Sequence, residues 1–169
     1  MNTNDTEKLR RLLEGFATAT LTTRRSDGGW HARPMAVAQV EDNADVWFIT
    51  SESTVKAAEI EADSHVLVVC QEGWKSCVVV EGCAALVRDR EKVRELWKPA
   101  FRPWFTGGVD DESIILIRVA GNRAEFWDNT GTNRLIYAYE SLKAVMKGSA
   151  PAMKGRGQHG QVALTTSKP

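Results

Sequence analysis

The sequence has little net charge, few cysteines and few histidines. It has 169 residues, three cysteines, three histidines and a formal net charge of zero. A zero net charge gives no electrostatic reason to expect nucleic acid or an anionic membrane as a partner. No hydrophobic run is long enough to span a bilayer, and the polar N-terminus lacks the apolar core of a signal peptide. We therefore expect a protein with no nucleic-acid partner and no membrane.

The cysteines and histidines predict neither a disulfide framework nor a metal site. The three thiols belong to Cys70, Cys77 and Cys83. Their number is odd and no C-x-x-C spacing occurs, so free thiols in a reducing cytoplasm are the expected state. The histidines lie far apart and have no metal-ligand spacing, so we expect no metal.

Hydrophobic periodicity predicts a mainly β chain with a few helices. Helical spacing occurs at residues 5–16, 53–62, 89–97 and 132–147. Extended segments occur at 17–24, 30–40, 45–50, 65–71, 76–87, 113–119 and 123–128. Turn signals join several of them into hairpins, one at Gly28 and one at Gly121, whereas Gly82 inside a long strand predicts a bulge or a close approach of backbone. Consecutive antiparallel strands of this number predict a sheet that closes into a barrel.

The chain length and composition predict one domain followed by a tail. Residues 1–147 contain all the predicted elements, which fits a single domain. Residues 148–169 are rich in Gly, Pro and Ser, carry three basic residues and no acid, and show no periodicity. This composition predicts a basic tail with little order. A dinucleotide-binding Rossmann fold is not predicted, because the glycine pair at 28–29 falls in a hairpin turn.

One constellation predicts a phosphate site. Arg33-Pro34-Met35 lies in one predicted strand, and a second strand ends at Thr50 before a helix that carries Lys56. Hydroxyls cluster between the strand end and the helix, at Thr50, Ser51, Ser53 and Thr54. A helix N-terminus offers unpaired N–H groups, and Arg and Lys add charged donors, so this pattern favours a phosphate group. Each feature alone also fits a helix cap or a solvated surface charge.

In order and spacing, these segments resemble the pyridoxamine 5'-phosphate oxidase-like flavoproteins, and most of all their general stress protein branch. The resemblance runs from about residue 7 to 140. It is carried by Arg33-Pro34-Met35, by 47–50 with Lys56, and by the segments Val78-Val79-Val80-Glu81-Gly82, 104–111 and Ala124-Glu125-Phe126-Trp127-Asp128. It implies an antiparallel FMN-binding split barrel that forms a homodimer with FMN at the subunit interface.

The resemblance also implies roles for particular residues. Arg33, Pro34 and Met35 match the strand that meets the flavin, and Lys56 matches the phosphate-binding lysine. The remaining positions that match cofactor contacts are Thr50, Ser51, Ser53, Ser76, Cys77 and Trp104. The implied activity is a flavin-dependent oxidoreductase, with NAD(P)H or another small molecule as reductant. No catalytic residue is assigned.

The sequence also departs from the oxidases proper. Ala38 and Gln39 stand where a cofactor lysine is expected, and Val55 replaces an arginine before Lys56. The segment that handles the pyridoxal substrate has no match, so pyridoxamine 5'-phosphate is not the predicted substrate. Two alternatives stay open: a flavin carrier, sensor or buffer without turnover, and a barrel that binds another planar cofactor. Haem is disfavoured because no axial His or Cys is well placed.

Overall fold

The computed structural model describes residues 3–128 and 159–164 of the chain. The helical elements are α1 (Thr3–Glu14), α2 (Val55–Ala62), α3 (Arg90–Leu96) and the short 3-10 helices η1 (Pro99–Trp104) and η2 (Gly108–Asp110). The strands are β1 (Thr18–Arg24), β2 (Trp30–Val40), β3 (Val46–Ser51), β4 (His65–Glu72), β5 (Ser76–Val87), β6 (Ile114–Asp128) and β7 (His159–Ala163). The elements expected between residues 5 and 97 all form, with boundaries close to the predicted ones.

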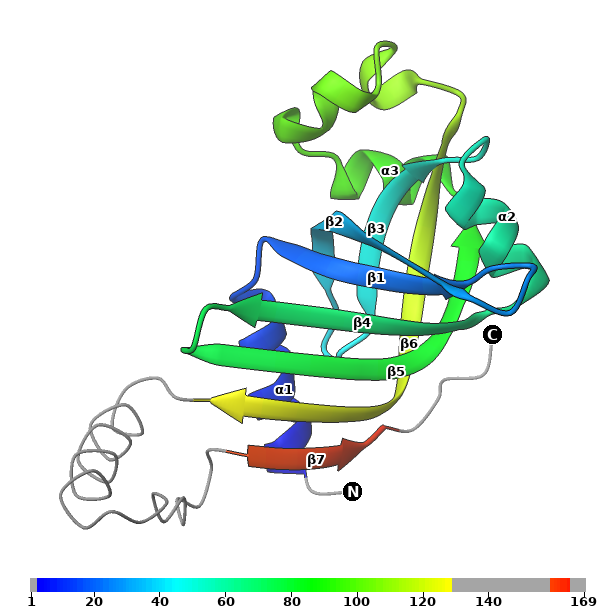
Figure 1. Ribbon diagram of the computed structural model, residues 1–169. Helices are drawn as coiled ribbons and strands as arrows, with labels where there is room; N and C mark the ends of the chain where they lie inside the picture. The colour runs from blue at the N-terminus through cyan, green and yellow to red at the C-terminus, as the bar shows by residue number, and fades with distance from the viewer. Residues whose placement is uncertain (1–2, 129–158, 165–169) are drawn as a thin grey trace, which may run out of the picture.

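Six antiparallel strands close into a barrel. The strand order is β3-β2-β1-β4-β5-β6-β7, and an additional pairing of β3 with β6 closes the ring. Strand β7 lies outside the ring and pairs with the second half of β6, on the edge opposite β5 (Figure 1). The prediction of a mainly β, antiparallel barrel is therefore confirmed. A barrel of this kind has no free strand edge along its closed part.

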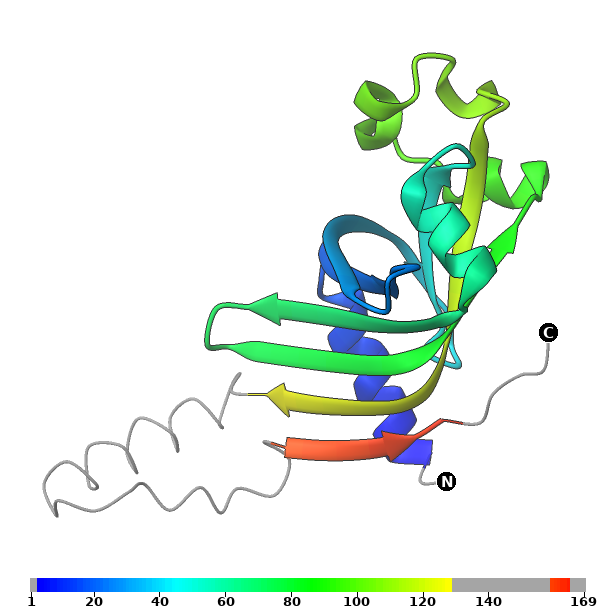
Figure 2. The same cartoon turned by 45° about the vertical axis from the view of Figure 1, so that its right-hand side comes forward.

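The barrel encloses the main hydrophobic core. Alternate residues of β4 and β5 point inward, as the burial of Val68, Val78 and Val80 shows. Helix α1 adds Leu9 and Leu13, both almost fully buried, to the same cluster. In two views 45° apart, α1 lies behind the strands at the lower end of the barrel (Figure 2). The helix forms because its apolar positions recur on one face, which the barrel then covers.

Strand β3 is buried on both faces. Val46 and Phe48 face the barrel core, whereas Trp47 and Ile49 belong to a second cluster with α3 and η1. This arrangement explains why β3 is an apolar run without alternation. The second cluster holds the helical segment between β5 and β6 against the outside of the barrel.

The predicted hairpin at Gly121 is wrong, because β6 is one continuous strand of 15 residues. Gly121 has no positive φ, whereas Gly28 and Gly73, which both lie in turns, do. A Cβ at Gly121 would lie 2.9 Å from Cγ1 of Val80 and 2.5 Å from a methyl of Leu164. Gly121 therefore permits close packing within a strand. The bulge predicted at Gly82 is confirmed, since the register of β5 against β6 shifts between Glu81 and Gly82.

Part of the predicted tail forms a strand. Strand β7 falls inside residues 148–169 and pairs with β6 from Arg123↔Ala163 to Trp127↔His159. Gly160 fits against the ring of Phe126, where a Cβ would come within 2.4 Å of it. The helix predicted at 132–147 lies outside the described residues.

Candidate functional site

A cavity opens where β2 and β3 diverge. Strand β2 pairs with β3 only from Val37 to Val40, while residues 30–36 pair with β1 alone. Strand β3 pairs with β6 along its whole length, and its end, from Ile49 to Ser51, pairs with β6 alone. Between the separated strands lies a cavity of about 540 Å³, within the size range of small-molecule sites. Its walls come from β2, β3, the start of α2 and η1.

Lys56 provides a cation at this cavity. It lies in the first turn of α2, is partly buried, and its Nζ donates to Oγ1 of Thr50 at 3.0 Å. Among the described residues, no carboxylate lies within ion-pair distance of Nζ. Burial lowers the pKa of Lys56, the neighbouring charge of Arg33 lowers it further, and Glu59 partly offsets both effects. An anion in the cavity would relieve this unfavourable environment.

The start of α2 also lacks a side-chain cap. The N-cap residue is Thr54, and its hydroxyl donates to the carbonyl of Ser51 at 2.8 Å rather than accepting from the helix. Neither Ser51 nor Ser53 is the N-cap residue of this helix. Helix N-terminal N–H groups without a cap are free to bind another acceptor. The hydroxyls of Thr50 and Thr54 lie 3.3 Å apart beside them.

Arg33 is not the free cation that the sequence suggests. Its Nη2 donates to Oε2 of Glu59 at 2.7 Å, and its Nη1 donates to Oγ1 of Thr23 at the same distance. Thr23 in turn donates to Oε2 of Glu59 at 2.6 Å. His31 contacts the second oxygen, Oε1, at 3.1 Å. Arg33 still lines the cavity, but the charge of its guanidinium is paired with the carboxylate of Glu59.

Part of the cavity wall is aromatic. Trp97 packs edge-on against Phe101 and Phe105, with ring centroids 6.0 Å apart in each case. Lys98 ties this segment to the barrel through a 3.2 Å bond from Nζ to the carbonyl of Val37. Trp104 follows at the end of η1 and lines the cavity with 73% of its surface exposed. An exposed indole held on a packed turn offers a flat surface to a planar ligand.

The cavity brings together seven of the ten residues predicted to contact a cofactor. These are Arg33, Pro34, Met35, Thr50, Ser51, Lys56 and Trp104. Ser53 does not line it; it is exposed and its hydroxyl lies 3.2 Å from that of Ser51. Ser76 and Cys77 begin β5 beside the β4–β5 turn, at the end of that hairpin away from α2 (Figure 1). Neither residue lines this cavity, and their predicted cofactor contacts stay a prediction.

Sequence reasoning missed several residues of this region. The lining of the cavity also includes Thr18, Phe101 and Phe105. Glu59 does not line the cavity, but it forms an ion pair with Arg33. Glu59 follows Lys56 by three residues, so both lie on one face of α2. From this spacing, the sequence could have indicated that Glu59 lies near the site. The sequence contains no such indication for Phe101 and Phe105, because these side chains reach the cavity only through tertiary packing.

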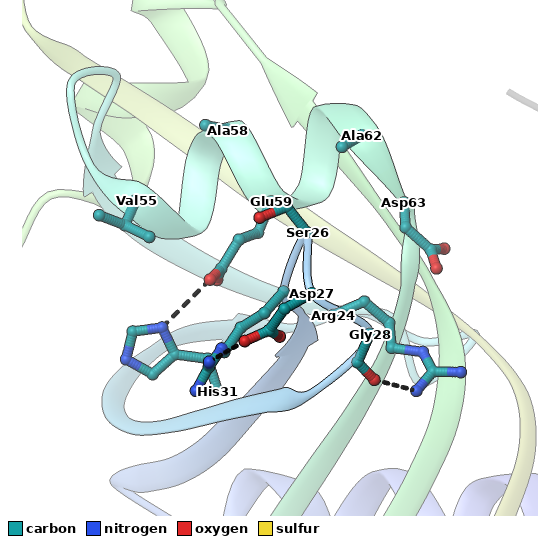
Figure 3. A pocket seen from close by; sticks show the side chains of 11 residues that line it. Arg24, Ser26, Asp27, Gly28, His31, Val55, Ala58, Glu59, Ala62 and Asp63 are labelled. Carbon is teal, nitrogen blue, oxygen red and sulfur yellow. Dashed lines mark hydrogen bonds and ion pairs between the residues drawn. The ribbon is translucent and has the colours of Figure 1, made fainter.

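A larger cavity, of about 750 Å³, is lined by Glu59, which does not line the smaller one (Figure 3). The β1–β2 turn and α2 form its walls, and His31 points from β2 toward Glu59 across it. Its charges are already paired locally: Arg25 contacts Asp27, and Arg24 donates to the carbonyl of Gly28. The larger cavity has walls of mixed charge, and these charged side chains already have partners nearby. It is therefore the weaker candidate for an anionic ligand.

Known structures share this barrel over most of its length. A general stress protein 26 from Jannaschia sp. is 25% identical with a TM-score of 0.72, over 96% of this chain and 100% of that chain. A general stress FMN/FAD binding protein from Xanthomonas citri is 28% identical with a TM-score of 0.63, over 75% of this chain and 89% of that one. The fold thus matches that of proteins described as flavin-binding and stress-related.

Residues 4–152 match the family model described as pyridoxamine 5'-phosphate oxidase like, and the chain belongs to this family. Among curated proteins, Protein bli-3 of Neurospora crassa is 31% identical over 113 residues, which is 59% of this chain and 53% of that protein. The chain therefore spans about half the length of this curated relative. Within the described residues, no helix combines the length and apolar character that crossing a bilayer requires.

Proposed function

We propose that this protein binds FMN in the cavity between β2, β3, α2 and η1 and acts as a flavin-dependent oxidoreductase. The observation that carries the proposal is Lys56, a partly buried cation whose only hydrogen-bond partner among the described residues is the Thr50 hydroxyl. It stands at an uncapped helix start, where a phosphate monoester would find N–H groups and a cation together. The FMN/FAD-binding relative from Xanthomonas citri supports the assignment of a flavin.

The residues present fit both parts of an FMN molecule. Lys56, Thr50 and Thr54 would hold the phosphate through charge and hydroxyl groups. The apolar lining, which includes Met35 from β2 and Trp104 from η1, would hold the ring system. A flavin so held supplies two-electron chemistry, accepting a hydride from a donor such as NAD(P)H. The chain's own contribution would be to bind the phosphate, exclude water from the ring and admit the reductant.

A second candidate is a flavin carrier, sensor or buffer without turnover. It is favoured by the lining of the cavity, whose described residues include no Asp, Glu, His, Cys or Tyr. Lys56, which this proposal assigns to the phosphate, is the one described lining residue of a type that usually acts as a general acid or base. Oxidation of NAD(P)H by the FMN-loaded protein, at a rate above that of free FMN, favours the enzyme. A rate equal to that of free FMN favours the carrier.

We further propose a cytoplasmic homodimer with a role in the stress response. Trp30 and Trp104 are exposed in the single subunit, at 56% and 73%, and a second copy could cover them. Ser76 and Cys77 could then reach a flavin only from the partner subunit, because they lie away from the cavity of their own chain. The three cysteines are free, which suits a reducing compartment. The stress role is supported by the general stress proteins among the relatives.

The test is a titration of the purified protein with FMN, followed by flavin fluorescence, with the particle mass measured alongside. We expect saturable binding at micromolar FMN or below, one flavin per chain, and a mass twice the 18.7 kDa of one chain. Riboflavin serves as the ligand without phosphate and should bind more weakly. A protein that leaves the FMN signal unchanged up to about 100 µM, a concentration corresponding to about −5.5 kcal/mol, would contradict the proposal.

A further inference from the structure

Glu59 is a buried carboxylate that lines the larger cavity. It also forms an ion pair with Arg33, which lines the smaller cavity. It is 9% exposed and lines the larger cavity, where it faces His31 (Figure 3). Its Oε2 accepts from both Arg33 and Thr23, at 2.7 and 2.6 Å. Burial would raise the pKa of Glu59, but hydrogen bonds from Thr23, His31 and Arg33 outweigh it and lower the pKa. The carboxylate is therefore ionised at neutral pH.

This pairing changes the charge that a ligand meets in the smaller cavity. Arg33 and Lys56 contribute two positive charges at its lining, and Glu59 directly behind Arg33 contributes one negative charge. The local sum is one positive charge, carried effectively by Lys56. A flavin monophosphate at neutral pH carries nearly two negative charges. The cavity is therefore less positive than its two lining cations suggest.

We propose that Glu59 is a specificity-determining residue, which limits how strongly the cavity prefers phosphorylated over unphosphorylated flavin. By cancelling the charge of Arg33, Glu59 leaves phosphate recognition to Lys56 and the α2 N-terminus. This inference rests on the flavin site proposed above and adds the residue that sets its selectivity. The opposing role would be that of a positioning residue, in which Glu59 aims Arg33 at the phosphate and strengthens the preference.

The two roles make opposite predictions for Glu59→Gln. The measured quantity is the ratio of the riboflavin Kd to the FMN Kd, in which the contribution of the ring cancels. Without the carboxylate, Arg33 is uncompensated and the ratio should rise on the order of 10-fold, because one unit of charge near a phosphate has that scale of effect. A fall in the ratio would instead assign Glu59 the positioning role and overturn the proposal.

Arg33→Gln and the double variant R33Q/E59Q complete the charge series. With Arg33 alone removed, the carboxylate is left unpaired and the ratio should fall on the order of 10-fold. With both removed, the local charge returns to that of the wild type. The ratio should then lie within about threefold of the wild-type ratio, which is a smaller change than one unit of charge would cause. The matched control is Glu61→Gln, an exposed carboxylate on the same helix, which should leave the ratio unchanged.

The double variant also keeps the proposal testable if Glu59→Gln fails to fold. A partly buried guanidinium without its carboxylate is destabilising, whereas removing both charges together is tolerated better. If Arg33 itself binds the phosphate, the folded double variant will lose the preference for FMN, and the proposal is overturned. Failure of the flavin site as a whole looks different, since the wild type would then bind neither FMN nor riboflavin.

Discussion

Replacing Lys56 with alanine is expected to weaken FMN binding on the order of 10- to 100-fold while changing riboflavin binding by less than about threefold. The reason is that Lys56 is the cation of the cavity that no carboxylate among the described residues neutralises. Its lowered pKa reflects a charge that has lost part of its hydration without gaining an ion-pair partner. A phosphate would supply that partner, and riboflavin would not.

The measurement is a pair of fluorescence titrations, with FMN and with riboflavin, on the wild type and on Lys56→Ala. Lys75→Ala is the matched control, since Lys75 is an exposed lysine paired with Glu72 in the β4–β5 turn. It should bind both ligands as the wild type does. Equal weakening of FMN and riboflavin by Lys56→Ala would show that this lysine does not meet the phosphate.

Replacing Phe48 with alanine is expected to lower the free energy of unfolding by about 3–5 kcal/mol. Phe48 is fully buried in the barrel core, on the strand whose pairing with β6 closes the ring. Removing its ring leaves a cavity among side chains held by strands on both sides, which limits how far they can collapse into it. The loss is a large part of the total stability of about 5–15 kcal/mol that a domain usually has.

Urea denaturation followed by circular dichroism would measure this loss. Val55→Ala is the comparison, because Val55 is 64% exposed and its truncation should change the free energy by no more than about 0.5 kcal/mol. A loss below about 1 kcal/mol for Phe48→Ala would mean that the barrel core packs less tightly around β3 than the structure indicates.

The sequence predicted most of the fold because its local signals agree with one another. Hydrophobic period and turn glycines indicate the same elements from α1 to α3. In the structure, Asp89 also caps α3 by accepting from two backbone N–H groups. The errors came from glycines that serve packing. Gly121 and Gly160 sit where a neighbouring side chain leaves no room for a Cβ. A glycine needed for close approach looks the same in a sequence as a glycine needed for a turn.

The sequence predicted the charged and hydroxyl residues of the candidate site. It did not predict that a carboxylate neutralises one of the two cations. Lys56, Thr50 and Arg33 stand out because they flank a strand end and a helix start. The aromatic wall of Phe101 and Phe105 comes from a segment about 50 residues further along the chain, and only tertiary packing brings it to the cavity. The pairing of Arg33 with Glu59 depends on how α2 is oriented on β1 and β2. Nothing in the local sequence specifies that orientation.

The most direct test of the central claim is a crystal structure of the protein with FMN bound. We predict the flavin in the cavity between β2 and β3, with its phosphate in contact with Nζ of Lys56 and the first turn of α2. Arg33 should remain paired with Glu59. A flavin bound instead in the larger cavity beside His31, or a phosphate that does not contact Lys56, would contradict this account.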